Sequence, residues 1–212
     1  MEKSMEKSME KRIDNFVKKV FNIWQMLKDE YGIYQDIPLV IAPSDEFGKY
    51  KAIMLNSLFN VSQFKPNEFE NDDDSFAVST TYIGPDNNNI CRVFCAGVII
   101  NARIIFKIVN KKAEEEMIDF IEILLRHEIG HMISTVMMHE GITMEESNAV
   151  DAKVKMLEND MLSKMNNNIS YEENINLPYE EYVSLPMEAH ANACANVDVD
   201  KLIALCYKFD QL

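Results

Sequence analysis

The sequence lacks the basic character that a nucleic-acid or membrane partner requires. Its 21 lysine and arginine residues are outnumbered by 35 aspartate and glutamate residues, so the formal net charge is −14. Phosphate groups and anionic lipid headgroups bind clustered basic side chains, and this deficit therefore argues against both kinds of partner. Solubility explains the acidity, and recognition of a basic substrate is the alternative.

Cysteine is scarce as well, and its spacing does not indicate a thiolate zinc site. The chain has four cysteines, no two of which form a CxxC pair: Cys91, Cys95, Cys194 and Cys206. If Cys91 and Cys95 share a strand, the rise of four residues separates them by about 13 Å, which is too far for a disulfide. Reduced thiols in a cytoplasmic protein are the expectation.

Long apolar runs are also missing. No stretch of about 18 consecutive apolar residues is present, so no transmembrane segment is predicted. Residues 1–12, MEKSMEKSMEKR, lack the apolar segment of a signal peptide. This charged repeat is expected to extend the helix that follows it and to fray in solvent. The length of 212 residues suits a single domain over 1–212.

The residues that are present predict strands in the first half of the chain. Composition or alternation typical of strands marks four segments: Ile37 to Ile41, Phe76 to Ile83, Ile90 to Cys95 and Val98 to Val109. In the last segment every even-numbered residue is apolar, which predicts a strand with one polar face. As an edge strand, it would be able to pair with an extended peptide. Residues 66–75 and 166–176 are predicted as loops.

Helices are predicted before and after these strands. An amphipathic helix ends near Gly32, and later helices cover 112–138, 143–165, 186–195 and 198–209. Thr143 and Glu146 form a capping box, and Asp198 caps the last helix. Strands followed by helices indicate an α+β fold with a small mixed sheet.

The predicted helix over 112–138 contains HExxH, with His127, Glu128 and His131 at its defined positions. Residues four apart lie on one face of a helix, so both imidazoles are able to reach one metal ion. Glu128 follows the first histidine, which places its carboxylate near a water on that metal. Zinc lowers the pKa of such a water to about 7, and a neighbouring carboxylate accepts its proton during attack on a carbonyl.

The competing interpretations are that the motif arose by chance or that its histidines are core residues bonded to the backbone. Two observations favour a metal site. The motif lies on a helix that is apolar on most sides. The chain has only 4 histidines, and two of them, His127 and His131, belong to this motif. Zn²⁺ is the expected cofactor.

A second motif offers a third ligand. Residues 186–195, PMEAHANACA, read P-x-E-x-x-A-N-x-x-A. Together with HExxH, this motif resembles the zincins with a glutamate third ligand, especially the ExxAN and ExxAD branches that include ImmA/IrrE-type phage-repressor peptidases. The resemblance covers roughly residues 98–196. It implies a zincin-like fold in which Glu188 binds zinc and Asn192 supports a ligand histidine.

Other third ligands stay open from the residues alone. Ser134 and Met137 stand where HExxHxxGxxH requires glycine and histidine, so that pattern fails. His190 could replace Glu188, but on one short helix the two point about 200° apart. Three acidic residues on the helix over 143–165 are possible ligands that are better explained as solvated positions: Glu145, Glu146 and Asp151.

These features predict a zinc-dependent peptidase that hydrolyses a protein or peptide substrate. Glu128 is the expected general base, and three residues are candidates to donate a hydrogen bond to the oxyanion: Tyr179, Tyr182 and His190. His139, near the end of the HExxH helix, is expected to satisfy the last carbonyls. The alternative is a non-enzymatic regulatory or phage-associated binding module that keeps the zincin fold.

Overall fold

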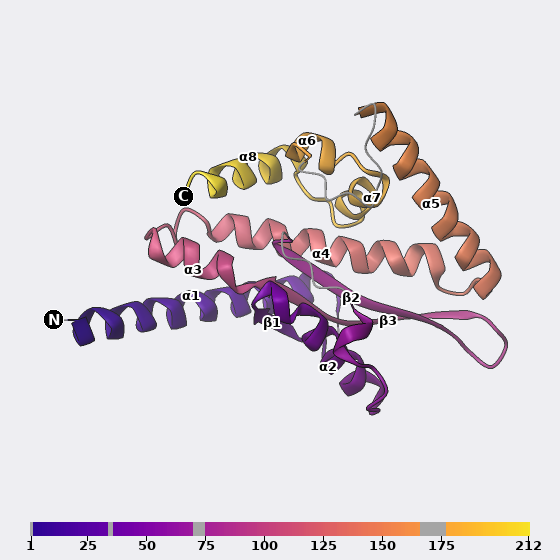
Figure 1. Ribbon diagram of the computed structural model, residues 1–212, viewed down its shortest axis with the longest axis horizontal. Helices are drawn as coiled ribbons and strands as arrows, with labels where there is room; N and C mark the ends of the chain where they lie inside the picture. Colours follow the sequence, from indigo (N-terminus) through magenta and orange to yellow (C-terminus); the bar gives the residue numbers. More distant parts are fainter. Residues whose placement is uncertain (1, 34–35, 70–74, 166–176) are drawn as a thin grey trace.

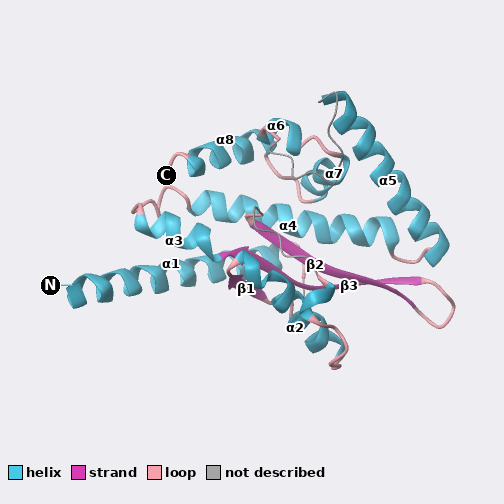
Figure 2. Cartoon of the chain, viewed as in Figure 1, coloured by secondary structure: helices cyan, strands magenta, loops and turns pink. Residues whose placement is uncertain are grey.

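Helix α4 (Ile118–His139) runs through the middle of the molecule, with other elements on both sides of it. The computed structural model describes residues 2–33, 36–69, 75–165 and 177–212. In Figure 1 the sheet lies on one side of α4, and the helices that follow α4 in the sequence lie on the other. Figure 2 shows the strands gathered below α4 in the same view. No helix in the described part of the chain has both the length and the apolar character needed to cross a membrane.

The predicted α+β fold with a mixed sheet is confirmed. Within the described residues the sheet has three strands in the order β1-β3-β2: β1 (Leu39–Ala42), β2 (Ala77–Pro85) and β3 (Cys91–Asn101). β1 is parallel to β3, with Leu39 opposite Val98, and β2 is antiparallel to β3. Both β2 and β3 contact α4, so the sheet packs on the HExxH helix as expected.

The strand predicted over 98–109 is wrong in its second half. β3 ends at Asn101, whose side chain accepts a hydrogen bond from the Arg103 amide at 3.1 Å and so caps α3 (Ala102–Asn110). Phe106 breaks the predicted alternation, because it is 50% exposed. The apolar residues that α3 buries recur at helical spacing: Ala102, Ile104, Ile105, Ile108 and Val109.

The predicted edge position of this segment is wrong as well. β3 is hydrogen-bonded to β1 on one side and to β2 on the other, so its backbone groups are already used within the sheet. Among the described strands, β1 and β2 occupy the edges. An extended peptide therefore has to pair with one of those two strands.

Two helices from the first part of the chain cover the sheet and α4. α1 (Glu2–Glu30), which includes most of the charged repeat, packs on α3 and α4 through a buried stripe: Phe16, Val20, Trp24 and Leu27. Gly32 has a φ of 64°, a left-handed conformation typical of the residue after a helix end. α2 (Phe47–Phe59) packs on β3, flanked by the short 3₁₀ turns Ser44–Glu46 and Pro66–Glu68.

α4 begins at Ile118 rather than at residue 112. Lys112 has a left-handed φ of 58°, and the Ala113 amide bonds back to the Ile108 carbonyl, which ends α3 and prevents a continuous helix. α5 (Met144–Met165) has the predicted capping box. The Thr143 hydroxyl accepts from the Glu146 amide at 3.2 Å, and the Glu146 carboxylate accepts from the Thr143 amide at 2.9 Å.

Three helices cover the side of α4 opposite the sheet: α6 (Tyr179–Tyr182), α7 (Pro186–Cys194) and α8 (Val199–Asp210). The Asp198 carboxylate accepts from the Lys201 amide at 3.0 Å, which confirms the predicted cap of the last helix. The loop predicted over 166–176 lies outside the described residues, as does the part of the 66–75 loop from 70 to 74.

Candidate metal centre

His127 and His131 lie one turn apart on the face of α4 that meets α7. Their rings are edge to face, with centroids 4.6 Å apart, and their Nε2 atoms are 3.1 Å apart. His127 is buried, with 6% of its surface exposed, whereas the side chain of His131 is 21% exposed. The HExxH spacing thus brings two metal-binding nitrogens to one point.

Glu188 reaches the same point from the first turn of α7. Its Oε2 atom is 3.0 Å from the Nε2 atom of His127 and 3.3 Å from that of His131. Among the described residues, the three side chains form the one group of histidine, cysteine and acidic side chains with the spacing of a metal site. The ligand set expected from the sequence is therefore brought together.

A glycine on α4 allows this approach of α7. A Cβ atom added to Gly130 would lie 2.1 Å from the carbonyl oxygen of Ala191, far inside van der Waals contact. Ala191 is completely buried at the crossing. Because only glycine fits there, the backbones of α4 and α7 come close enough for a glutamate on α7 to reach both histidines.

Asn192 fixes the orientation of His127. The amide oxygen of Asn192 lies 2.8 Å from Nδ1 of His127, and both residues are buried. This contact holds a proton on Nδ1, so Nε2 is the ring nitrogen that is directed toward Glu188. Ligand histidines are commonly held in this way by an amide or carboxylate. The role that the resemblance implies for Asn192 thus has the required geometry.

The three side chains fit a zinc ion by two criteria. A tetrahedral zinc ion about 2.0–2.1 Å from each ligand keeps ligand atoms about 3.3 Å apart. The three separations here are 3.0, 3.1 and 3.3 Å. In addition, Oε2 of Glu188 is buried and forms no hydrogen bond of good geometry with any described residue. A cation between the three ligand atoms would satisfy this buried carboxylate oxygen.

The charged side chains around the three ligand atoms favour a positive charge between those atoms. Burial opposes protonation of His127, but the Glu188 and Glu128 carboxylates outweigh it and raise the pKa of His127 to about 9. Burial likewise opposes ionisation of Glu188, but His127 and His131 outweigh it and lower the pKa of Glu188 to about 2. A proton occupies the site when no metal is bound, and a metal ion would replace it.

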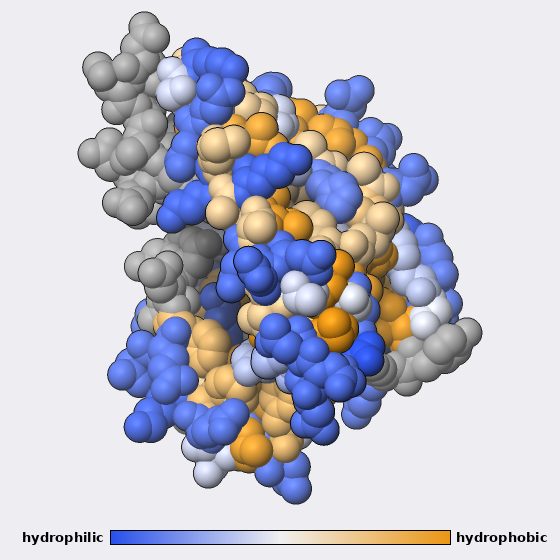
Figure 3. Space-filling view, turned by 90° about the vertical axis from the view of Figure 1, so that its right-hand side faces the viewer, coloured by the Kyte–Doolittle hydropathy of each residue, from blue (hydrophilic) through white to orange (hydrophobic). Residues whose placement is uncertain are grey.

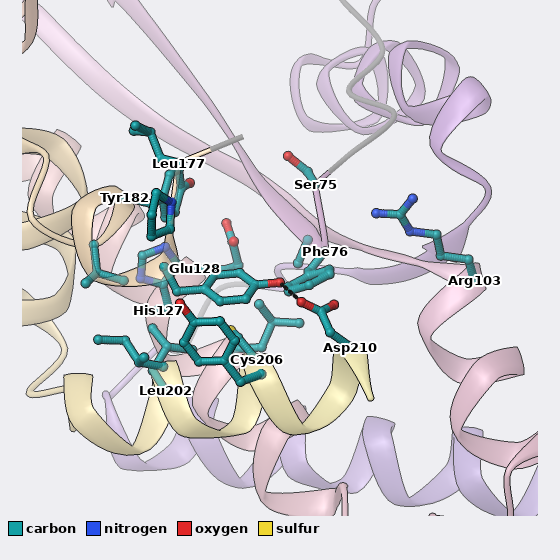
Figure 4. Close-up of a pocket in the computed structure, with 17 residues that line it drawn as sticks. Ser75, Phe76, Arg103, His127, Glu128, Leu177, Tyr182, Leu202, Cys206 and Asp210 are labelled. Carbon is teal, nitrogen blue, oxygen red and sulfur yellow. Dashed lines mark hydrogen bonds between the residues drawn. The ribbon is translucent and has the colours of Figure 1, made fainter. Parts of the chain in front are cut away.

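Glu128 lies beside the ligand group and faces a cavity of about 800 Å³. The start of β2 and the helices α4, α6 and α8 supply the walls, which are largely aromatic and aliphatic. Figure 4 shows the Glu128 carboxylate directed into the space between Phe76 and Tyr182. His127 also lines the cavity, so a molecule held there would contact both the ligand group and the expected base.

The three candidate hydrogen-bond donors to the oxyanion do not all line the cavity. Tyr182 lines the cavity with Glu128 and is 43% exposed. Tyr179 lines it too, but its hydroxyl donates to the Asp210 carboxylate at 2.9 Å. His190 is directed elsewhere, with Nδ1 2.6 Å from the Ser134 hydroxyl, and it is not part of the cavity wall. Of the three candidates, only the two tyrosines therefore lie beside the cavity that Glu128 faces.

The acidic residues that were alternatives to Glu188 as the third zinc ligand have other roles or positions. Asp151 lies 3.4 Å from Nε2 of His139, whose Nδ1 is 2.8 Å from the Ser147 hydroxyl. His139 therefore connects α4 to α5 instead of satisfying the last carbonyls of α4. Glu146 is used in the capping box of α5, and Glu145 is exposed in the first turn of the same helix.

Sequence reasoning missed a buried acid that contacts the first turn of the helix that carries Glu188. Glu158, on α5, is 5% exposed, and its carboxylate accepts a hydrogen bond from the Met187 amide at 3.3 Å. It thereby caps the first turn of α7, whose own N-terminal residue provides no side-chain cap. Burial raises the pKa of Glu158. Nothing in the spacing along α5 distinguishes Glu158 from its solvated acidic neighbours.

Comparisons of the chain with protein-family models, with curated proteins and with solved structures gave no match. The chemistry of the site is therefore inferred from the positions of its own residues.

Proposed function

We propose that the protein is a zinc-dependent peptidase. The observation that carries the proposal is the convergence of His127, His131 and Glu188, whose ligand atoms lie 3.0 to 3.3 Å apart. Structural zinc sites usually have four protein ligands, whereas catalytic sites have three and an open position. Three ligands beside a large cavity support a catalytic rather than a structural site.

Zinc in such a site would acidify a water and polarise a substrate carbonyl. Glu128 adjoins the first ligand and points into the cavity, where it would accept a proton from the attacking water. Tyr182 lines the same cavity, and its hydroxyl would donate to the oxygen that gains negative charge. Asn192 would keep His127 in the tautomer that binds metal.

A peptide or protein substrate has a suitable edge strand in β2. Ala77, the first residue of β2, lines the cavity together with His127 and Glu128. β2 lies at the edge of the described sheet, so its outer backbone groups would pair with an extended chain. β2 would thus take the peptide-pairing role that was predicted for 98–109. The apolar walls of the cavity would then accept a large hydrophobic side chain of that substrate.

The test is a pair of glutamate-to-glutamine variants assayed with an unbiased peptide library and for self-cleavage. Glu128→Gln preserves shape and zinc but removes the proton acceptor, so hydrolysis should fall by about 10²–10⁴-fold. Glu145→Gln, an exposed glutamate on α5, is the matched control and should leave the rate unchanged. Hydrolysis that survives Glu128→Gln would refute the proposed mechanism. Wild-type protein that binds zinc but cleaves nothing would favour a binding module.

A further inference from the structure

α7 carries metal-binding groups on two of its sides. Glu188 faces the histidines of the metal centre, whereas His190 and Cys194, which are four residues apart, lie elsewhere on the helix. The Sγ atom of Cys194 is 3.8 Å from Nε2 of His190 and 3.7 Å from Sδ of Met137 on α4. The thiol of Cys194 thus lies close to both an imidazole and a thioether, outside the proposed zinc ligand group.

His190 is held so that its Nε2 atom faces Cys194. Its Nδ1 atom is 2.6 Å from the hydroxyl of Ser134, which is completely buried. Asn192 holds His127 in the same manner at the zinc centre. A fixed partner on the second ring nitrogen is what orients ligand histidines in metal sites.

We propose that Met137, His190 and Cys194 bind a soft monovalent metal ion, Cu(I). Thiolate and thioether ligands select Cu(I) over hard ions, and imidazole is compatible with both sulfur donors. A metal ion about 2.0–2.3 Å from nitrogen and sulfur ligands keeps neighbouring ligand atoms about 3.5–4.0 Å apart. The two separations of 3.8 and 3.7 Å fall in that range.

The proposed Cu(I) site is accessible to solvent and lies between two closely packed helices. Met137 is 67% exposed and lies near the end of α4. Figure 3 shows one face of the molecule, on which hydrophobic residues are interspersed with hydrophilic ones. The close contact of Gly130 with Ala191 fixes α4 against α7. Burial raises the pKa of Cys194, so its thiol is protonated before an ion arrives and metal binding releases that proton.

Occupancy would connect the two helices that carry the zinc ligands. Met137 belongs to α4, as do His127 and His131, while Cys194 belongs to α7, as does Glu188. The Cu(I) ion would hold Glu188 against the histidine pair without touching any of the three. The two sites therefore differ in ligands and metal but share their supporting helices.

The experiment titrates the full chain with Cu(I), without oxygen, against a chromogenic Cu(I) chelator. The wild type should retain about one Cu(I) per chain, and Cys194→Ser should lose it. Met137→Leu changes an exposed side chain and should leave folding unchanged while it weakens binding at least about tenfold. Ser134→Ala should weaken binding by about tenfold. Cys95→Ser and Met156→Leu are matched controls that should bind as the wild type does.

Two results would overturn this assignment. One is Cu(I) binding by Cys194→Ser or Met137→Leu that equals the wild type. The other is loss of Cu(I) binding in a His127→Ala/His131→Ala chain, which would place the ion in the zinc centre. Retention of zinc by Cys194→Ser, measured on the same samples, supports two separate sites. Failure of the zinc proposal alone would leave the Cu(I) titration unchanged.

Discussion

The histidines in two regions of α4 have different partners. In the middle of the helix, the Nε2 atoms of His127 and His131 face each other and an oxygen of Glu188 that lacks a good hydrogen bond among the described residues. At the end of the helix, His139 is 3% exposed and has a partner at each ring nitrogen. Those partners are Ser147 at 2.8 Å and Asp151 at 3.4 Å.

This difference shows that partners, rather than burial, distinguish a ligand histidine from a structural one. Buried polar atoms cost free energy unless they are paired. His139 satisfies both nitrogens within the protein and needs nothing more. The middle pair leaves three ligand atoms converging on one point, and a cation there would satisfy all of them. If zinc binds as proposed, the same helix uses the same residue type in two different roles.

The largest expected difference is in zinc content. His127→Ala combined with His131→Ala should abolish zinc binding, whereas His139→Ala should keep about one zinc ion per chain. His139→Ala should instead lower the free energy of unfolding by about 1–3 kcal/mol, because the buried Ser147 hydroxyl loses its partner. Metal analysis after dialysis and urea unfolding measure the two effects. Loss of zinc from the His139 variant alone would reverse the comparison.

The acidic partners of the two regions should differ nearly as much. Glu188→Ala removes a zinc ligand and should lower zinc affinity strongly, while Asp151→Ala removes only a neighbour of His139 and should barely change it. Competition with a zinc chelator gives both affinities. If the order were reversed, the third ligand would lie on α5.

A smaller effect is expected from the groups that orient each histidine. Asn192→Ala should weaken zinc binding by about 10–100-fold, because His127 loses the contact that fixes its ring. Ser147→Ala, the equivalent change beside His139, should leave zinc affinity unchanged. Equal zinc affinities in the two variants would show that the Asn192 contact does not position a ligand.

The smallest effect concerns pH and the metal-free protein. The pKa of His127 is raised from 6.5 to about 9, so its contribution to stability is complete below pH 6.5 and is lost as the pH rises through 9. Zinc replaces the proton, so zinc should stabilise the protein more as the pH rises over this range. Thermal unfolding with zinc and with chelator measures the difference. A pH-independent difference would contradict the assigned proton.

Local features of the site could be predicted from the sequence, because each depends on spacing along one helix. His127 and His131 share a face by the geometry of any α-helix, and the capping box at Thr143 involves neighbours in the chain. The grouping of Glu188 with the two histidines was predicted only from the resemblance of the two motifs to those of zincins. The structure brings these residues together at a point that spacing alone does not specify.

Contacts between distant segments could not be predicted. Glu158 caps α7 from another helix, and His139 meets Ser147 and Asp151 across a turn, so no local pattern marks either contact. The segment over 98–109 was ambiguous for a different reason. Ile100, Ile104 and Ile108 are spaced by four, which fits a period of two as well as a helical period, and the Asn101 cap favours the helix.

The most direct test of the metal centre is a crystal structure of the zinc-loaded protein, with anomalous scattering recorded at the zinc absorption edge. The predicted result is a strong peak about 2.0–2.2 Å from Nε2 of His127, Nε2 of His131 and Oε2 of Glu188. Zinc-saturated crystals with no peak at these atoms, or with the peak at His139 and Asp151, would contradict the account.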